Sequence, residues 1–264
     1  MKLAVNYSVP LDNLLSQGLV ELDLLKCPEW DGVVKAGLKL KPVYIHFDIS
    51  AGNGSVTNLD FDLIRRMLKM TDTPHLNCHL AADPALDPKK PADMRRLVKV
   101  WKSEMQYLRA QVEGCPLVAE NLPCAPYMPG SEIGSNPELI REALDSLGVD
   151  LLLDLSHARI TAANLGLDYQ EYIHQLPVER LAELHITGIR PYRSYLTDHF
   201  EMRSEDWEAA GWAAEQIASH AWREPEIVAF EYGGIGDVFG WRSEEWVLKE
   251  QIPRLNGMFS GGTG

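Results

Sequence analysis

The amino-acid sequence predicts an α/β protein that folds as a single (β/α)8 TIM barrel. Three observations lead to this expectation. The chain has 264 residues, a length that suits one barrel domain. Short apolar segments alternate with longer amphipathic segments, and eight such repeats are what a closed parallel barrel needs. The apolar segment at residues 150–155, DLLLDL, shows little alternation, as expected for a strand that is covered on both faces.

The eight expected strands occupy residues 3–7, 19–25, 43–47, 76–80, 116–120, 150–155, 181–187 and 227–232. Helical segments separate nearly all of them, most clearly at residues 10–18, 91–112, 137–147 and 206–221. Pro91 suits the first turn of a helix, where its missing N–H costs nothing. No linker or second domain is apparent. We therefore expect one domain over residues 1–260, with the Gly-rich residues 261–264 as a flexible tail.

Composition narrows the class of function. The net charge is −13 and the pI is near 5.0, whereas a protein that binds a phosphate backbone is usually basic, so nucleic acid is a poor candidate partner. The four cysteines, Cys27, Cys78, Cys115 and Cys124, form no CxxC pair, which is typical of a reduced cytoplasmic protein. We find neither an export-type leader nor an apolar run of ~18 residues, and so expect no membrane span.

Residues of the metal-ligand types recur at the C-terminal ends of the third to eighth expected strands. In a parallel barrel those ends meet at one mouth. The candidate ligands are His46, His79, Glu120, Asp154, His157, His185, Asp198, His199 and Glu231. Imidazoles and carboxylates together suit divalent iron, zinc or manganese, and carboxylates can bridge two ions about 3.5–4 Å apart.

A single histidine at a strand end is more often an ordinary hydrogen-bonded residue than a ligand. Six consecutive strands with a His, Asp or Glu at the same end are different, because burying so many ionisable groups without metal carries a large desolvation cost. His75, His174 and His220 lack this placement, since His75 lies at the opposite end of its strand and the other two lie in helical segments. We assign no role to these three.

Four segments carry a family resemblance: VYIHFDISAG (43–52), NCHLA (77–81), AENLP (119–123) and DLSHARITAANLGLDYQEYIHQLPVERLAELHITG (154–188). They resemble motifs of the xylose-isomerase-like barrel superfamily, including its endonuclease IV branch. The closer likeness is to the multinuclear non-haem iron-dependent oxidative enzymes. The resemblance covers most of the chain. It implies two or three metal ions, commonly iron, and oxidation of a peptide or thiol substrate.

Two departures from that family concern a third ion. The family usually has a second histidine four residues after the one that matches His185, where this chain has Ile189. The loop that follows usually reads Asp-x-His, but Asp198 and His199 are adjacent here. We expect one ion on His46, His79 and Glu120, and a second on Glu120, Asp154, His185 and Glu231. The third, on His157 and His199 with or without Asp198, should have fewer protein ligands.

Roles beyond metal binding follow from position. We expect catalytic roles for Glu120, Glu231 and His199. Substrate-binding roles are expected for Asn6, Asn121, Arg159 and Arg190. The two arginines could bind a carboxylate or phosphate through paired hydrogen bonds, with pairing to surface acids as the alternative.

Four functions fit these residues. The first is an iron-dependent oxidative enzyme that acts on a peptide or a small thiol or amide, with a partner protein that delivers the peptide. The main alternative is a sugar isomerase or epimerase, in which Glu120 or Glu231 moves a proton. A phosphodiester hydrolase is disfavoured by the acidic charge, and a non-catalytic binding barrel by the retained set of metal-ligand residues.

Overall fold

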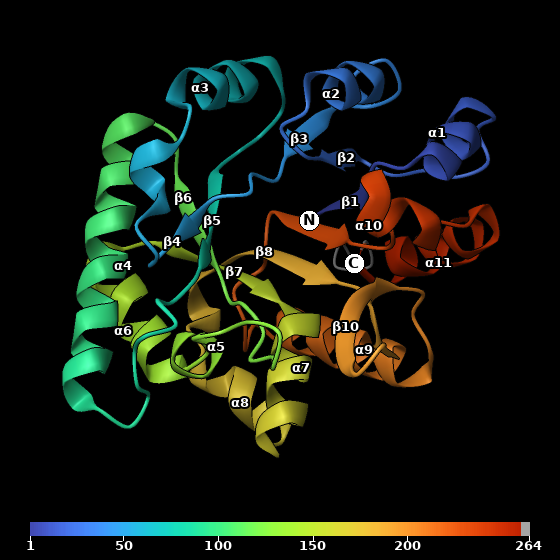
Figure 1. The fold of residues 1–264 in the computed structure, drawn as a ribbon. Coiled ribbons are helices and arrows are strands. Elements are labelled where there is room, and N and C mark those ends of the chain that lie inside the picture. The colour runs from blue at the N-terminus through green and yellow to red at the C-terminus, as the bar shows by residue number, and fades with distance from the viewer. Residues whose placement is uncertain (260–264) are drawn as a thin grey trace.

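The predicted barrel is present as a curled parallel sheet with helices on its outside (Figure 1). The computed structural model describes residues 1–259, so the expected tail at 261–264 lies outside the described residues. Within the described part the sheet order is β3-β2-β1-β11-β8-β7-β6-β5-β4 and every pair is parallel. The strands are β1 (Lys2–Asn6), β2 (Leu24–Cys27), β3 (Val43–Ile45), β4 (Ser50–Ala51), β5 (Leu76–Leu80), β6 (Leu117–Glu120), β7 (Asp150–Asp154), β8 (Leu181–Ile186) and β11 (Ile227–Phe230).

The helices follow the predicted pattern. α6, for example, is capped before its first residue by Asn136, whose side chain accepts from the N–H of Glu138, and after its last residue by Gly148, which has a left-handed φ. The helices are α1 (Val9–Ser16), α2 (Asp31–Gly37), α3 (Phe61–Met70), α4 (Pro91–Gln111), α5 (Ser131–Gly134), α6 (Pro137–Leu147), α7 (Leu155–Leu165), α8 (Tyr169–Gln175), α9 (Ser204–Ala218), α10 (Gly236–Phe239) and α11 (Glu245–Phe259), with 3-10 turns η1 (Ser55–Asn58), η2 (Val178–Arg180) and η3 (Gly240–Arg242). Among residues 1–259, no helix has both the length and the apolar character that a membrane crossing needs.

The third expected strand is broken, and the break closes the barrel. β3 pairs with β2 and β4 pairs with β5, so residues 43–51 join the two ends of the sheet. Asn77 fills the gap between them. Its Oδ1 accepts from the N–H of Phe47 at 2.7 Å and its Nδ2 donates to the C=O of Phe47 at 2.9 Å. This side chain therefore satisfies the backbone groups that the broken strand leaves unpaired.

Side chains inside the barrel form layers, because alternate residues of a strand point to opposite faces. Val5 and Phe230 pack in the large core between sheet and helices, whereas Ala4 and Ala229 belong to a small separate cluster. The side chains two positions after this small cluster, such as Asn6 after Ala4 and Glu231 after Ala229, also point into the barrel and lie at its mouth. We call these eight residues the mouth layer: Asn6, Lys26, His46, His79, Glu120, Asp154, His185 and Glu231.

Two expected elements differ from the structure. The second strand was expected at 19–25 but lies at Leu24–Cys27, and residues 19–23 belong to no strand or helix. The segment that holds Asp198 and His199 was expected to be a loop. It is an antiparallel hairpin of β9 (Gly188–Tyr192) and β10 (Tyr195–Phe200).

Candidate metal centre

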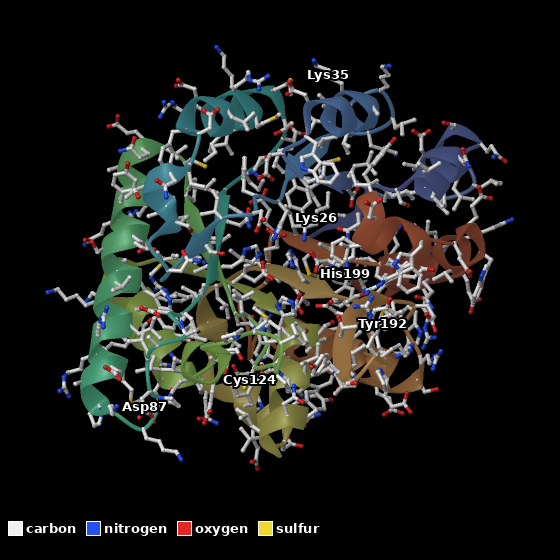
Figure 2. All side chains as sticks on the ribbon, in the orientation of Figure 1. Lys26, Lys35, Asp87, Cys124, Tyr192 and His199 are labelled. Carbon is white, nitrogen blue, oxygen red and sulfur yellow. The ribbon has the colours of Figure 1, made fainter. Side chains whose placement is uncertain are left out.

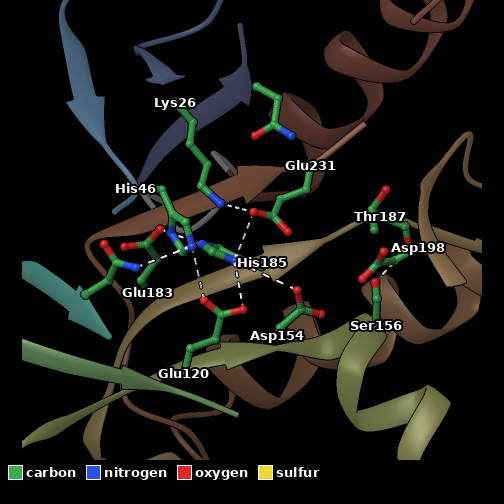
Figure 3. Close-up of polar contacts among 12 residues, drawn as sticks. Lys26, His46, Glu120, Asp154, Ser156, Glu183, His185, Thr187, Asp198 and Glu231 are labelled. Carbon is green, nitrogen blue, oxygen red and sulfur yellow. Dashed lines mark hydrogen bonds and ion pairs between the residues drawn. The ribbon is translucent and has the colours of Figure 1, made fainter. Parts of the chain in front are cut away.

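The mouth layer contains six of the nine predicted ligands. His157, at the start of α7, and Asp198 and His199, on β10, reach the same place from outside the sheet. Figure 3 shows acidic and imidazole side chains from different strands pointing toward a common centre around His185. Residues that are far apart in sequence thus meet where parallel barrel strands end.

His46, His79 and Glu120 direct three ligand atoms toward one point. The Nε2 atoms of the two histidines are 3.2 Å apart, and each lies 3.4 Å from Oε2 of Glu120. All three ligand atoms lie within 4.8 Å of one another, a spacing that allows one ion to contact them all.

Asp154, His185 and Glu231 form a second group beside the first. Nδ1 of His185 lies 3.2 Å from Oε1 of Glu231 and 3.9 Å from Oδ2 of Asp154. Glu120 also reaches this group, since its Oε1 is 4.0 Å from Nδ1 of His185. Glu120 therefore directs one carboxylate oxygen toward each group, which is the arrangement that a bridging ligand requires.

Several buried polar atoms of these two groups lack hydrogen-bond partners. They are Nδ1 of His46, Oε2 of Glu120, Oδ2 of Asp154 and Nδ1 of His185. A buried polar atom without a partner is costly, and four at one place need an explanation. Metal coordination would satisfy the atoms of Glu120, Asp154 and His185, and the donor set of imidazoles and carboxylates suits iron, zinc or manganese. The residues present therefore fit a metal centre.

The protonation states of two of these side chains, Glu120 and His46, suit metal ligands. Burial alone would raise the pKa of Glu120, but His79, His157 and His185 more than offset it and hold that pKa well below its usual range. Burial, followed by the charge of Lys26, holds the pKa of His46 well below its ordinary value. Glu120 is thus ionised and His46 neutral at neutral pH, as metal binding requires.

Asp198 and His199 both face the mouth, next to His157. Oδ2 of Asp198 is 3.0 Å from Nε2 of His157, and its Oδ1 is 4.0 Å from Nε2 of His199. Adjacent strand residues normally point to opposite faces. Here a register shift between Thr197 and Phe200, together with a φ of 62° at His199, brings the two side chains together. Burial lowers the pKa of His199 to about 4, so its imidazole is neutral at pH 7.

Backbone carbonyls orient the two imidazoles of this third group. Nδ1 of His157 lies 2.9 Å from the C=O of Asn121, and Nδ1 of His199 lies 3.2 Å from the C=O of Gly233. A ring N–H held by a carbonyl leaves Nε2 available as a ligand. Asn6 donates to the same Gly233 carbonyl at 3.2 Å, which ties the first strand to this loop.

Glu183 supports His185 from inside the barrel, and the sequence analysis missed it. Its Oε1 accepts from Nε2 of His185 at 2.6 Å and from the Tyr44 hydroxyl at 2.9 Å. Its Oε2 is 2.5 Å from Nε2 of His75, a histidine for which we predicted no role. Because Glu183 holds Nε2, His185 presents Nδ1 to the second group. The spacing of two residues from His185 could have revealed Glu183, since it places both on one strand face.

Glu183→Gln should weaken metal binding by about 10–100-fold, because the neutral amide no longer fixes the ring orientation and basicity of His185. Titration with Mn²⁺, followed by calorimetry, measures the change. Tyr44→Phe is the matched control, since it removes a hydrogen bond from Glu183 but leaves the contact with His185 intact. Equal affinities for Glu183→Gln and the unchanged protein would contradict this role.

A cavity of about 600 Å³ opens over the three groups, a volume within the range of small-ligand sites. Its polar floor includes Lys26, His46, Glu120 and Glu231. Its rim is mainly apolar and includes Trp30, Leu122, Tyr127, Met128, Ile235, Val238 and Phe239.

Two further cations lie at this cavity, and sequence reasoning missed both. Lys26 is buried and contacts Glu231, and burial lowers the pKa of Lys26 to about 8. Arg242 packs against the ring of Phe200, with its Cζ 4.4 Å from the ring centroid, and donates to the C=O of Asp198 at 2.7 Å. Arg242 therefore holds the irregular part of β10 that presents Asp198 and His199.

Of the four predicted substrate-binding residues, one lines the cavity and three do not. Asn6 lines the cavity, whereas Arg159 and Arg190 are not among its lining residues. Their guanidinium groups instead donate to Asp206, at 2.7 Å and 2.9 Å. Because Asp206 is buried on α9, the structure gives these two arginines the role of anchoring the hairpin and α7 to that helix.

Asn121 is also not among the residues that line the cavity. Its Oδ1 accepts from the N–H of Asp154 at 2.9 Å and its Nδ2 donates to the C=O of Asp154 at 3.0 Å. It therefore joins the mouth ends of β6 and β7, much as Asn77 bridges the broken strand.

Comparison with known proteins gives a match over half of the chain. Residues 90–221 match the family described as RiPP precursor modification enzyme MbnB/TglH/ChrH. A UPF0276 protein of Pseudomonas aeruginosa is 33% identical over 73 residues, which are 28% of this chain and 25% of that protein. The match therefore spans about a quarter of that curated relative.

Two solved structures share the fold. D-psicose 3-epimerase aligns with a TM-score of 0.59 and 12% identity, covering 99% of this chain and 100% of that one. A xylose isomerase-like TIM barrel/4-hydroxyphenylpyruvate dioxygenase fusion protein aligns with a TM-score of 0.56 and 15% identity, covering 97% and 42%. At these identities the likeness concerns the fold alone, and it confirms the predicted TIM-barrel fold.

Proposed function

The chain belongs to the RiPP precursor modification enzyme family MbnB/TglH/ChrH, and we propose that it is an iron-dependent oxidative enzyme that modifies a peptide. The observation that carries the proposal is a set of buried, unpartnered ligand atoms on Glu120, Asp154 and His185, next to a cavity that Glu120 lines. Two or three ions would be held by His46, His79, Glu120, Asp154, His157, His185, Asp198, His199 and Glu231.

Iron bound by such a donor set supplies redox chemistry with molecular oxygen. Glu120 and Glu231 lie at the cavity floor and would hold ions against the reacting part of the substrate. His199 lines the same cavity, and its neutral Nε2 can bind an ion there. The apolar rim would keep water away from this centre.

A peptide substrate suits the surface around the mouth. Trp30, Tyr127 and Val238 are 52%, 43% and 60% exposed there, and large exposed apolar side chains favour contact with another chain. A partner protein that delivers the peptide is part of the proposal. A cytoplasmic location is also part of the proposal. It is supported by the four cysteines of residues 1–259, which are all free thiols.

The test incubates iron-loaded protein with oxygen and with peptides that are encoded beside its gene. We expect a change in peptide mass that needs both iron and oxygen and is absent from a His46→Ala variant. D-fructose serves as the probe for the alternative of a sugar isomerase or epimerase. Epimerisation of the sugar, with every peptide unchanged in mass, would overturn the proposal.

A further inference from the structure

Lys26 is the only cationic side chain in the mouth layer, every member of which lies within the described residues. It comes from β2 and its side chain is 4% exposed. Its Nζ contacts Oε1 of Glu231, one of the expected ligands. A buried lysine at this place is notable because the other residues of the layer are one amide and six groups of metal-ligand type.

The oxygen that Lys26 contacts also faces the second ligand group. Oε1 of Glu231 is 3.2 Å from Nδ1 of His185, the nitrogen that Glu183 leaves available. Figure 3 shows Oε1 between the ammonium and the imidazole. An ion on Asp154, His185 and Glu231 would therefore either share this carboxylate with Lys26 or displace the lysine from it.

We propose that Lys26 is a resident cation that competes with a metal ion for Glu231 and so sets the affinity of the second group. This inference rests on the proposed metal centre. An ammonium and a divalent ion on one carboxylate repel each other, and in a buried site that repulsion is weakly screened. Without metal, the same ammonium neutralises Glu231 and makes its burial tolerable. Lys26 thereby lowers the affinity of the second group for its ion below the affinity that Asp154, His185 and Glu231 alone would provide.

The charge of Lys26 can be removed with little change of shape by Lys26→Met. We expect the apparent dissociation constant of the ion in the second group to fall by about tenfold or more, measured by calorimetric titration of metal-free protein with Mn²⁺. Lys35→Met is the matched control. It removes the same charge from an exposed position on α2, and Figure 2 shows Lys35 at the outer surface and Lys26 in the interior. An unchanged or weaker affinity in Lys26→Met would overturn the inference.

A second pair of variants assigns the effect to Glu231. In a Glu231→Gln background the shared carboxylate is gone, so adding Lys26→Met should change Mn²⁺ affinity by less than about twofold. A tenfold gain in that background would mean that Lys26 acts elsewhere, and the inference would be wrong.

Metal-free Lys26→Met leaves a buried carboxylate unpaired and could be poorly folded. Melting temperatures with and without Mn²⁺ therefore accompany the titration. We expect Mn²⁺ to raise the melting temperature of Lys26→Met more than that of the unchanged protein, and an equal or smaller rise counts against the inference. If neither protein binds Mn²⁺, Zn²⁺ or Fe²⁺, the proposed function itself fails, which is a separate result from equal binding by both.

Discussion

Replacing Glu120 by glutamine is expected to remove more than one metal ion from the protein. The Oε2 atom of Glu120 lies 3.4 Å from Nε2 of both His46 and His79, while its Oε1 faces His157 and His185 at 3.3 Å and 4.0 Å. A carboxylate that bridges two ions contributes to both, whereas a neutral amide is a weak ligand for either. Elemental analysis after reconstitution measures the loss.

Glu113→Gln is the matched control for this change, because Glu113 is exposed and lies outside the cavity. It should keep the full metal complement and the melting temperature. If Glu120→Gln loses one ion and the spectrum of the remaining site is unchanged, Glu120 is a terminal ligand and the bridging assignment is wrong.

His199→Ala is expected to remove one metal ion and to abolish activity. The other two ions and the fold should remain. Ile189 cannot act as a ligand, so the third group depends on His157, Asp198 and His199. Fewer protein ligands mean weaker binding and more positions open to substrate, as at catalytic ions in general. The same ion should be the first to leave during titration with a chelator.

His220→Ala is the control for the effect of placing alanine at a residue with a positive φ. Both His199 and His220 have a positive φ, of 62° and 60°, a conformation that costs an alanine more than a glycine. A change in metal content that is confined to His199→Ala therefore reports on the imidazole. Retention of every ion, or loss of all of them, would contradict the division of the cluster into three groups.

Strand periodicity made much of the mouth predictable. His79, Glu120 and Asp154 lie at the ends of expected strands and His185 lies within the next one, and a parallel barrel brings such strand ends together. Lys26 was missed because the second strand was placed at 19–25, one residue short of it, whereas β2 runs to Cys27. With the observed register, the inward position two residues after Leu24 is Lys26.

Tertiary contacts decided what periodicity could not. Arg159 and Arg190 lie near the mouth in sequence, but Asp206, some distance along the chain, draws both guanidinium groups to α9. The irregular pairing that turns Asp198 and His199 to the same side depends on the hairpin, which no local pattern specifies. The contacts of residues with a polar partner far along the chain are thus the ones that the sequence alone did not predict.

Metal content is the most direct test of the central claim that these side chains form a multinuclear centre. Protein purified without oxygen and reconstituted with Fe²⁺ should carry about two or three ions per chain by elemental analysis, as converging imidazoles and bridging carboxylates allow. Less than about half an ion per chain after reconstitution with Fe²⁺, Mn²⁺ or Zn²⁺ would contradict the claim, because a centre with three ligand groups should fill at least one of them.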